Sequence, residues 1–257
     1  MQSSPPYKIF FISDSAATID FGNIIDEDIN RKALGIFHHL QQFPLLGMIE
    51  AIPAYSSVTV YFDVLLLRKK IPSQLKVYEW INNELHKLMQ GDHIATAEEK
   101  NVIRIPVCYD DEFAIDLSWI ANQKNLTREE VIHLHCSRQY RVYMLGFLPG
   151  FAYMGQVDEK IVVPRKPEPQ PIMAGSVGIA SKQTGIYPLN SPGGWQIIGR
   201  TPVKMFDKAR DEPCLLKAGD SVEFYSVSKD EFDYIENDAV SKSSVVIARK
   251  ERPKQSD

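Results

Sequence analysis

The sequence contains no segment that resembles a membrane span or a secretory signal. Its longest apolar runs, such as Val64 to Leu67, fall far short of the roughly 20 residues that a helix needs to cross a bilayer. Residues Met1 to Tyr7 lack a basic start followed by an apolar run and a small-residue cleavage site, which are the parts of a signal peptide. These absences predict a chain that neither spans a membrane nor is secreted.

Cysteine is scarce, and the net charge is small. The three cysteines, Cys108, Cys136 and Cys214, are widely spaced, which argues against a disulfide framework and for a reducing compartment. A formal net charge of −4 and a pI of about 5.9 leave no electrostatic footprint for nucleic acid or an anionic membrane. We therefore expect a cytoplasmic protein whose partners are small molecules or proteins, with no nucleic acid and no membrane among them.

One stretch matches a nucleotide-binding motif only in part. Gly194-x4-Gly199-Arg200-Thr201 resembles a P-loop in which Arg replaces Lys, and a P-loop must open a helix. Here Trp195 to Ile198 is strand-like, and Pro202 is followed by another β-prone run, so a helix is not favoured. The sequence predicts a strand between turns and no nucleotide motif in this chain.

Motifs for metal binding and for a serine nucleophile are missing. His133 and His135 lie two positions apart on a predicted helix, so their side chains point roughly 200° apart and cannot share one metal ion. The sequence has no C-x-x-C, H-E-x-x-H or acidic calcium loop, the usual signatures of zinc and calcium sites. Ser176 lacks the G-x-S-x-G spacing of a nucleophile elbow. We predict no metal site and no serine hydrolase triad.

The N-terminal part of the sequence alternates strands and helices. Its β-prone runs are Lys8 to Ile12, Ala17 to Phe21, Leu46 to Ile52 and Ser57 to Phe62. Apolar residues recur at helical spacing from Ile29 to Phe43, and a second helix is predicted from a Ser73 N-cap through Leu88. The order ββαββα predicts a small α/β domain in which two helices cover one face of an antiparallel sheet, and hence an α+β protein.

The polar segment from Gly91 to Lys100 separates this part from a remainder rich in Gly and Pro. We place the domain boundary there, with a small α/β domain over residues 1–95 and a second domain over residues 100–245. Residues 246–257 are charged and contain Pro, and we expect this tail to be disordered.

Short β-prone runs dominate the second domain. Val102 to Cys108 is the first of them, and Thr127 with Glu130 then forms a capping box that opens a short helix. From Tyr140 onward, β-prone runs alternate with Gly and Pro turns. Many short strands with few helices predict a barrel or a sandwich.

Residues 145–207 hold more polar and aromatic side chains than turns require. Phe147, Phe151 and Tyr153 lie among glycines, and Pro164-Arg165 puts a permanent cation at a rigid bend. The later turns supply hydroxyl, amide, indole and guanidinium groups from Ser176, Gln183, Thr184, Tyr187, Trp195 and Arg200. Because turns select Gly, Pro, Asn and Asp, we interpret the set as a polar, anion-capable pocket. The alternative is that the aromatic residues only fill a barrel interior.

Four motifs in this region resemble the family of 5-oxoprolinase B subunits. They are Tyr140 to Met154, Gly175 to Ala180, Gln183 to Pro188 and Ser191 to Trp195. The family is also labelled allophanate hydrolase subunit 1, and it includes a bacterial inhibitor of a sporulation sensor kinase. The chain departs from the family pattern at Gln170, where a second Pro-Arg pair is usual, and at Met173, where Pro is usual.

The resemblance implies a cyclophilin-like β-barrel after a smaller α/β domain. It also implies two kinds of partner, the C and A subunits of the enzyme, in a complex that hydrolyses 5-oxo-L-proline to L-glutamate at the expense of ATP. ATP is then used by the complex, since this chain has no nucleotide motif. Two alternatives remain open: a binding protein that inhibits a sensor histidine kinase, and a module like those of allophanate hydrolase or urea carboxylase.

Residue roles follow from the resemblance together with side-chain chemistry. His135 and Arg165 are the catalytic candidates, and packing of His135 on the barrel is the alternative for that residue. The candidates for substrate binding are Phe147, Phe151, Ser176, Gln183, Thr184, Tyr187, Trp195 and Arg200. We expect these side chains to line one pocket shared with the partner subunit, in which Arg165 and Arg200 supply positive charge.

Overall fold

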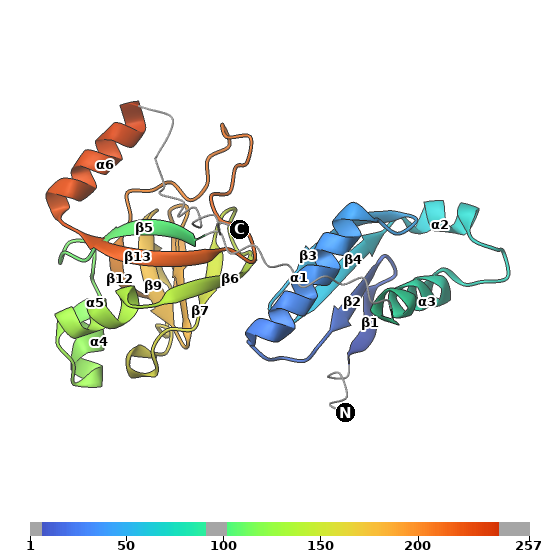
Figure 1. Ribbon diagram of the computed structural model, residues 1–257, viewed down its shortest axis with the longest axis horizontal. Helices are drawn as coiled ribbons and strands as arrows, with labels where there is room; N and C mark the ends of the chain where they lie inside the picture. Colours follow the sequence, from blue (N-terminus) through green and yellow to red (C-terminus); the bar gives the residue numbers. More distant parts are fainter. Residues whose placement is uncertain (1–6, 91–101, 242–257) are drawn as a thin grey trace, which may run out of the picture. The chain divides into compact units, whose positions relative to one another are not determined.

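The computed structural model describes residues 7–90 and 102–241. The chain divides into two compact units, Met1–Glu98 and Glu99–Asp257, which are shown in Figure 1. The predicted boundary segment and the predicted disordered tail lie outside the described residues. The described part contains no helix that is long and apolar enough to cross a membrane.

The first unit is built on a four-stranded antiparallel sheet. Its strands are β1 (Lys8–Ser13), β2 (Ala16–Asp20), β3 (Met48–Pro53) and β4 (Ser57–Phe62). They pair in the order β1-β2-β4-β3, with β1 and β3 at the edges. These bounds agree with the predicted strands to within about two residues, because alternating apolar residues face one side of the sheet.

Helices α1 (Glu27–Gln42) and α3 (Val77–Gln90) provide the main cover of this sheet. The Asp26 carboxylate accepts hydrogen bonds from the backbone N–H groups of Asp28 and Ile29 and so caps the start of α1. The apolar faces of the two helices and the sheet share one buried core, which includes Ala33, Ile36, Leu40, Val58, Val60, Ile81 and Leu85. The predicted α+β layer is confirmed.

Two details of the helical prediction were wrong. A third helix, α2 (Val64–Lys70), starts after Asp63, whose carboxylate accepts a hydrogen bond from the N–H of Leu66. It has only seven residues, too few to show a helical period in the sequence. The Ser73 side chain does not cap α3, which begins at Val77, because the chain first makes a turn closed by the bond from Leu75 N–H to the Pro72 carbonyl.

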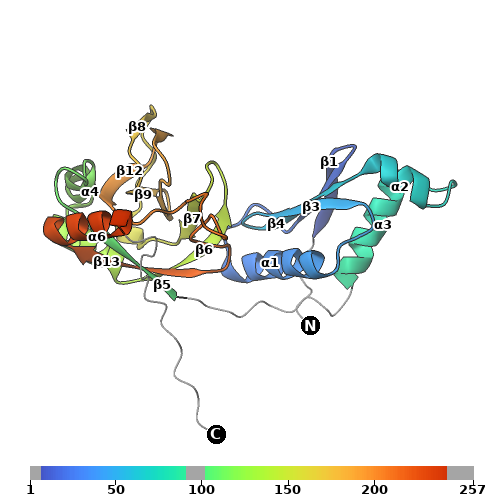
Figure 2. The same cartoon turned by 90° about the horizontal axis from the view of Figure 1, so that it is seen from above.

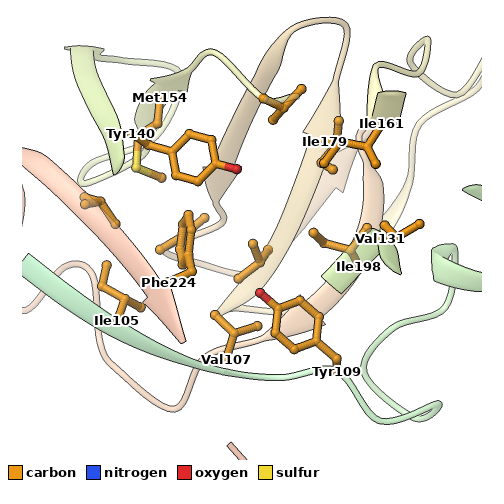
Figure 3. Close-up of a cluster of buried hydrophobic side chains, with 14 of the residues drawn as sticks. Ile105, Val107, Tyr109, Val131, Tyr140, Met154, Ile161, Ile179, Ile198 and Phe224 are labelled. Atoms are coloured by element: carbon orange, nitrogen blue, oxygen red, sulfur yellow. The ribbon is translucent and has the colours of Figure 1, made fainter. Parts of the chain in front are cut away.

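The second unit is a closed seven-stranded barrel, as the family resemblance implied. Its strands are β5 (Val102–Cys108), β6 (Gln139–Leu145), β7 (Ala152–Gly155), β9 (Ser176–Ala180), β10 (Gln183–Ile186), β12 (Gln196–Arg200) and β13 (Ser221–Val227). The order around the barrel is β10-β7-β6-β13-β5-β12-β9. Among these neighbouring strands, β5 and β13 pair in parallel, and the other pairs are antiparallel. Buried side chains such as Tyr140, Ile179 and Phe224 fill the interior (Figure 3).

The barrel carries more helices than the sequence suggested. Helix α5 (Arg128–Cys136) starts with the predicted Thr127–Glu130 capping box. Helices α4 (Leu117–Lys124) and α6 (Lys229–Ser241) were not predicted. A short 3-10 helix, η1 (Glu159–Ile161), follows β7. A two-stranded arm, β8 (Gln170–Ile172) with β11 (Ser191–Gly193), stands apart from the barrel sheet, as Figure 2 shows for β8.

Candidate functional site

The candidate site lies on the outer face of the barrel wall. Across four neighbouring strands, Tyr153, Gly185, Gly178 and Ile197 are paired in one row. Side chains alternate between the two faces of a strand. The residues next to this row in the sequence, such as Met154 and Ile179, point into the barrel interior (Figure 3), so the row itself faces outward.

A cluster of aromatic rings covers this row. The Phe151 ring centroid lies 4.8 Å from that of Tyr153, 5.2 Å from Tyr187, 5.4 Å from Trp195 and 5.8 Å from Phe147. We call Phe147, Phe151, Tyr153, Tyr187 and Trp195 the aromatic cluster. Four of these rings are wholly or partly buried, while Phe147 is 64% exposed. The sequence analysis named all five, and the structure brings them together.

Gly185 allows the aromatic cluster to sit directly on the strand backbone. A Cβ atom on this glycine would lie 3.0 Å from Cζ3 of Trp195 and 3.2 Å from Cζ of Phe151. Such distances are shorter than normal carbon–carbon contacts. Glycine at this position is therefore needed for close packing, since the ring edges take the space of a side chain.

Phe147 is held in an unusual backbone conformation. It has a φ of 67°, a region that bulky residues rarely occupy. The turn is closed by bonds from Gly146 N–H to the Phe151 carbonyl and from Phe151 N–H to the Leu148 carbonyl. This turn projects an apolar ring into solvent beside the rest of the aromatic cluster, as strained turns at binding sites often do.

Arg165 is the cation of the candidate site. Its guanidinium carbon lies 5.9 Å from the centroid of the Trp195 ring, within the range of a cation–π contact. The residue is exposed. The structure thus places a permanent positive charge on the indole of the aromatic cluster, where an anion can reach it.

The residues on either side of Arg165 hold its backbone in place through hydrogen bonds and an ion pair. The Pro164 carbonyl accepts a hydrogen bond from Nε2 of Gln196 at 3.1 Å, and the Lys166 N–H donates to the Gly194 carbonyl at 2.7 Å. Lys166 also forms an ion pair with Asp116 at 2.7 Å. The sequence analysis did not identify Gln196, Lys166 or Asp116, because their partners are distant in the chain.

The phenols of the aromatic cluster keep their protons at neutral pH. Burial raises the pKa of Tyr153 and of Tyr187 above the usual value, although the nearby Arg165 cation opposes this shift in both. The backbone N–H of Trp195 also donates to Tyr187 and opposes the shift. A neutral phenol can donate a hydrogen bond to a carbonyl or carboxylate oxygen.

Thr184 and His135 lie on the opposite side of the wall, inside the barrel. Both residues are fully buried. Thr184 Oγ1 lies 2.9 Å from Nε2 of His135 and donates to the Gly178 carbonyl at 3.1 Å. The other imidazole nitrogen, Nδ1, lies 2.9 Å from the hydroxyl of Tyr109. Neither side chain is accessible to a ligand on the outer face.

The environment of His135 favours the packing alternative over proton transfer. Its ring stacks on Phe224 with centroids 4.6 Å apart. Burial lowers its pKa from 6.5 to about 3, so the imidazole is neutral under ordinary conditions. A general acid or base works best with a pKa near the operating pH. The catalytic role of His135 stays a prediction that this geometry does not support.

Arg200 belongs to a different cluster from Arg165. Its guanidinium carbon lies 5.4 Å from the ring centroids of both Phe113 and Phe232. Its Nε donates to the Ala174 carbonyl at 3.0 Å, and an amino group lies 3.4 Å from the Glu236 carboxylate on α6. We expected the two arginines in one pocket. Instead they contact different residues: Arg165 lies over Trp195, whereas Arg200 contacts Phe232 and Glu236 of α6.

Ser176 and Gln183 occupy strand ends near the aromatic cluster. Ser176 is buried, and its carbonyl accepts a hydrogen bond from the Tyr187 N–H at 2.9 Å. Gln183 is partly exposed and pairs with Gly155 and Ala180. Ser176 thus supports a cluster residue through its backbone, while Gln183 keeps a side chain at the surface.

Phe151, Tyr187 and Trp195 of the aromatic cluster are buried with Ile172 of the β8–β11 arm, and Phe147 is the ring of the cluster that is most exposed. Two open grooves are evident on the described surface, with volumes of about 690 and 840 Å³, and no residue of the aromatic cluster lines either one. The described residues also contain no group of three or more His, Cys, Asp or Glu side chains able to hold a metal ion. The P-loop lookalike, Gly194 to Thr201, contains strand β12 (Gln196–Arg200), so the predicted strand is confirmed.

Comparisons with known proteins identify relatives of this chain. A family model described as "Carboxyltransferase domain, subdomain C and D" matches residues 7–216. The chain is 42% identical over 230 residues to the 5-oxoprolinase B subunit of Bacillus subtilis (strain 168), a match that covers 88% of this chain and 95% of that protein. It is 36% identical over 218 residues to the 5-oxoprolinase B subunit of Escherichia coli O157:H7, covering 84% and 94% respectively.

A solved structure shares the fold of this chain. The crystal structure of TTHA0988 matches with a TM-score of 0.70 and 36% sequence identity over 83% of this chain. This chain spans only 40% of that protein.

Proposed function

This chain belongs to the carboxyltransferase subdomain C and D family and, within it, to the 5-oxoprolinase B subunits, and from that premise we propose that it is the B subunit of a 5-oxoprolinase. In this proposal it acts with the A and C subunits to hydrolyse 5-oxo-L-proline to L-glutamate at the expense of ATP. The observation that carries the proposal is the match over nearly the full length of relatives that bear this name.

Arg165 and the aromatic cluster fit a small anionic ring compound. The substrate in this proposal has a carboxylate and a five-membered lactam. The exposed Arg165 guanidinium suits a carboxylate or a phosphoryl oxygen, and the exposed ring of Phe147 offers apolar surface to the lactam carbons. The protonated Tyr153 phenol is a suitable donor to a lactam oxygen as negative charge develops on it.

The reaction needs more groups than the aromatic cluster offers. A lactam is an amide with a poor leaving group, and coupling to ATP makes sense if phosphorylation of the carbonyl oxygen activates it for attack by water. In the described residues Arg165 is the cation on the face of the aromatic cluster, and the P-loop lookalike is a strand. We therefore assign ATP to the complex and not to a motif of this chain.

The open face of the aromatic cluster is where the proposal places the partner. Phe147 is largely exposed there, so a partner that covers its ring would remove apolar surface from water. A second protein on this face would exclude water and complete the site. TTHA0988 continues well beyond the region that this chain matches, which fits a relative that joins the same two units to further protein.

The direct experiment is reconstitution. The chain is co-purified with its candidate C subunit, the A subunit is added, and the release of ADP and glutamate that depends on 5-oxoproline is measured. We expect Arg165→Ala to lower kcat/KM about 100-fold, with Lys182→Ala, a change of an exposed residue in an ion pair with Glu159, as the control. Failure of the chain to bind the C subunit, or a complete complex with no dependence on 5-oxoproline, would reject the proposal.

A carboxyltransferase-like module of urea metabolism is the second candidate. The matching family model carries a carboxyltransferase description, which favours this alternative over others outside the oxoprolinases. The same reconstituted complex can be assayed with urea or allophanate, and ammonia release that is independent of 5-oxoproline would support it. Inhibition of a sensor histidine kinase stays a prediction, which kinase autophosphorylation in the presence of the purified chain would measure.

A further inference from the structure

The small N-terminal unit has a groove that the proposed function does not use. It has a volume of about 690 Å³ and is lined by Phe11, Ile12, Ser13, Asp14, Val64, Arg68, Lys76, Val77 and Tyr78. It lies where the turn after β1 meets α2 and the start of α3, helices that lie at one end of this unit in Figure 1. We call it the α2–α3 groove. All its residues belong to one compact unit, so its shape does not depend on the barrel.

The α2–α3 groove has an apolar surface that remains open to solvent. Ile12 is 53% exposed and Tyr78 is 51% exposed. The Tyr78 ring meets the Phe11 ring edge-on, with centroids 6.3 Å apart, which fixes its orientation. Leu65, on the adjoining helix, is 75% exposed. Exposed apolar residues that gather beside a hollow mark interaction surfaces more often than scattered ones do.

Positive charge is concentrated around the same groove. Residues 64–78 contain Arg68, Lys69, Lys70 and Lys76 and no carboxylate, whereas the whole chain has a formal net charge of −4; Asp14 is the carboxylate that lines the groove. Arg68 and Lys76 line the groove. Within the described ranges, 7–90 and 102–241, no ion pair joins either of them to a carboxylate. Lys76 lies over the Tyr78 ring, with Nζ 5.8 Å from its centroid.

The geometry of the groove favours docked side chains over an added strand. β1 is an edge strand, and an open edge can accept a further strand. Its pairing with β2 shifts register between Phe11 and Ser13, however, and such bulges discourage strand addition. The concave shape also favours a peptide over a flat lipid surface, because a bilayer cannot enter a hollow bounded by a turn and two helices.

We propose that the α2–α3 groove binds a peptide segment of a partner protein, with apolar side chains against Ile12 and Tyr78 and acidic side chains on Arg68 and Lys76. The partner is defined by this chemistry: a short segment in which Asp or Glu flanks aliphatic or aromatic residues. Charge complementarity supports the choice, since Arg68 and Lys76 line the groove without an ion pair and outnumber its one lining carboxylate, Asp14. The inference does not rest on the function of the barrel.

The experiment uses the full chain and a displayed library of random heptapeptides. Enriched peptides are synthesised with a fluorescent label and titrated by fluorescence anisotropy. We expect enrichment of Asp and Glu beside Leu, Phe or Trp. Arg68→Glu and Lys76→Glu should each weaken binding about tenfold, and Ile12→Ser should weaken it without changing the salt dependence. Raising the salt to about 0.5 M should weaken binding to the unaltered chain, because screening shortens the reach of the charges.

Lys87→Glu is the matched control, since this exposed lysine lies on α3 outside the groove and the change in charge is the same. Circular dichroism melting of each variant confirms folding. The proposal is rejected if no acidic peptides are enriched, or if their affinity is the same for the chain with both Arg68→Glu and Lys76→Glu. Binding to phosphatidylglycerol–phosphatidylcholine vesicles that both substitutions abolish, without enrichment of acidic peptides, would also reject it and indicate a membrane surface.

Discussion

His135 donates its Nε2 proton to the hydroxyl oxygen of Thr184, 2.9 Å away inside the barrel. The direction follows from the next bond, because the Thr184 hydroxyl uses its own proton for the Gly178 carbonyl. The Tyr109 hydroxyl can then donate to Nδ1 of the same neutral imidazole. Thr184 precedes Gly185, on which Trp195 packs, so this interior chain of hydrogen bonds holds the strand beneath the aromatic cluster.

Thr184→Val should destabilise the protein while keeping the shape of the side chain. The change leaves the buried Nε2–H of His135 without its acceptor, and an unsatisfied buried group costs about 1–3 kcal/mol. Urea denaturation measures the loss of unfolding free energy. Thr184→Ser, which keeps the hydroxyl, is the control and should lose much less. Equal stability of the two variants would mean that the hydrogen bonds contribute nothing.

His135 should make the protein less stable in mild acid. Burial lowers its pKa from 6.5 to about 3, so between these values the folded protein binds fewer protons than the unfolded chain, and the free energy of unfolding falls as the pH falls. The contribution is complete above pH 6.5 and decreases toward pH 3. Near pH 5 the loss is about 2 kcal/mol.

Urea denaturation at neutral pH and near pH 5 measures this loss. The His135→Gln variant cannot titrate at this position and should show a flatter dependence on pH, even if it is less stable at neutral pH. His133→Asn, on the exposed face of α5, should keep the dependence of the unaltered protein. A His135→Gln variant with an unchanged pH dependence would contradict the assignment.

Gly185→Ala should disturb the aromatic cluster. The added methyl group would meet the ring edges of Trp195 and Phe151 at 3.0 and 3.2 Å, and such overpacking costs about 1–3 kcal/mol. Thermal melting measures the cost, and a shift of the Trp195 indole resonance in an NMR spectrum reports the ring movement. The control is Gly194→Ala, where the nearest atom is 3.5 Å from the new Cβ. If Gly185→Ala melts like this control, the close packing is not required.

The two arginines should respond differently to substitution. Arg165→Ala removes an exposed side chain and should change the unfolding free energy by about 0.5 kcal/mol or less, while it impairs the reconstituted enzyme. Arg200→Ala removes the donor to the Ala174 carbonyl and the contacts with Phe113 and Phe232, and should cost about 1–2 kcal/mol. Parallel melting and activity measurements test the contrast. Equal losses of unfolding free energy in the two variants would contradict the conclusion that only Arg200 makes contacts that stabilise the fold.

The sequence alone determined the features that depend on neighbours along the chain. The capping box of Thr127 and Glu130 and the strand in place of a P-loop follow from local spacing and from the position of Pro202. Helix α6 could also have been predicted, because Ser228 and Glu231 exchange hydrogen bonds between side chains and backbone in the spacing of a capping box. Helix α2 was too short to leave a periodic pattern.

Only the tertiary structure decided which candidate residues share a site. Gln183 and Thr184 are adjacent in the sequence, but one reaches the surface and the other is buried with His135, since side chains alternate across a strand. Arg165 and Arg200 have the same chemistry, yet the rings of Trp195 and Phe232 hold them in separate clusters. These outcomes depend on strand pairing and helix packing between distant residues, which local sequence patterns do not specify.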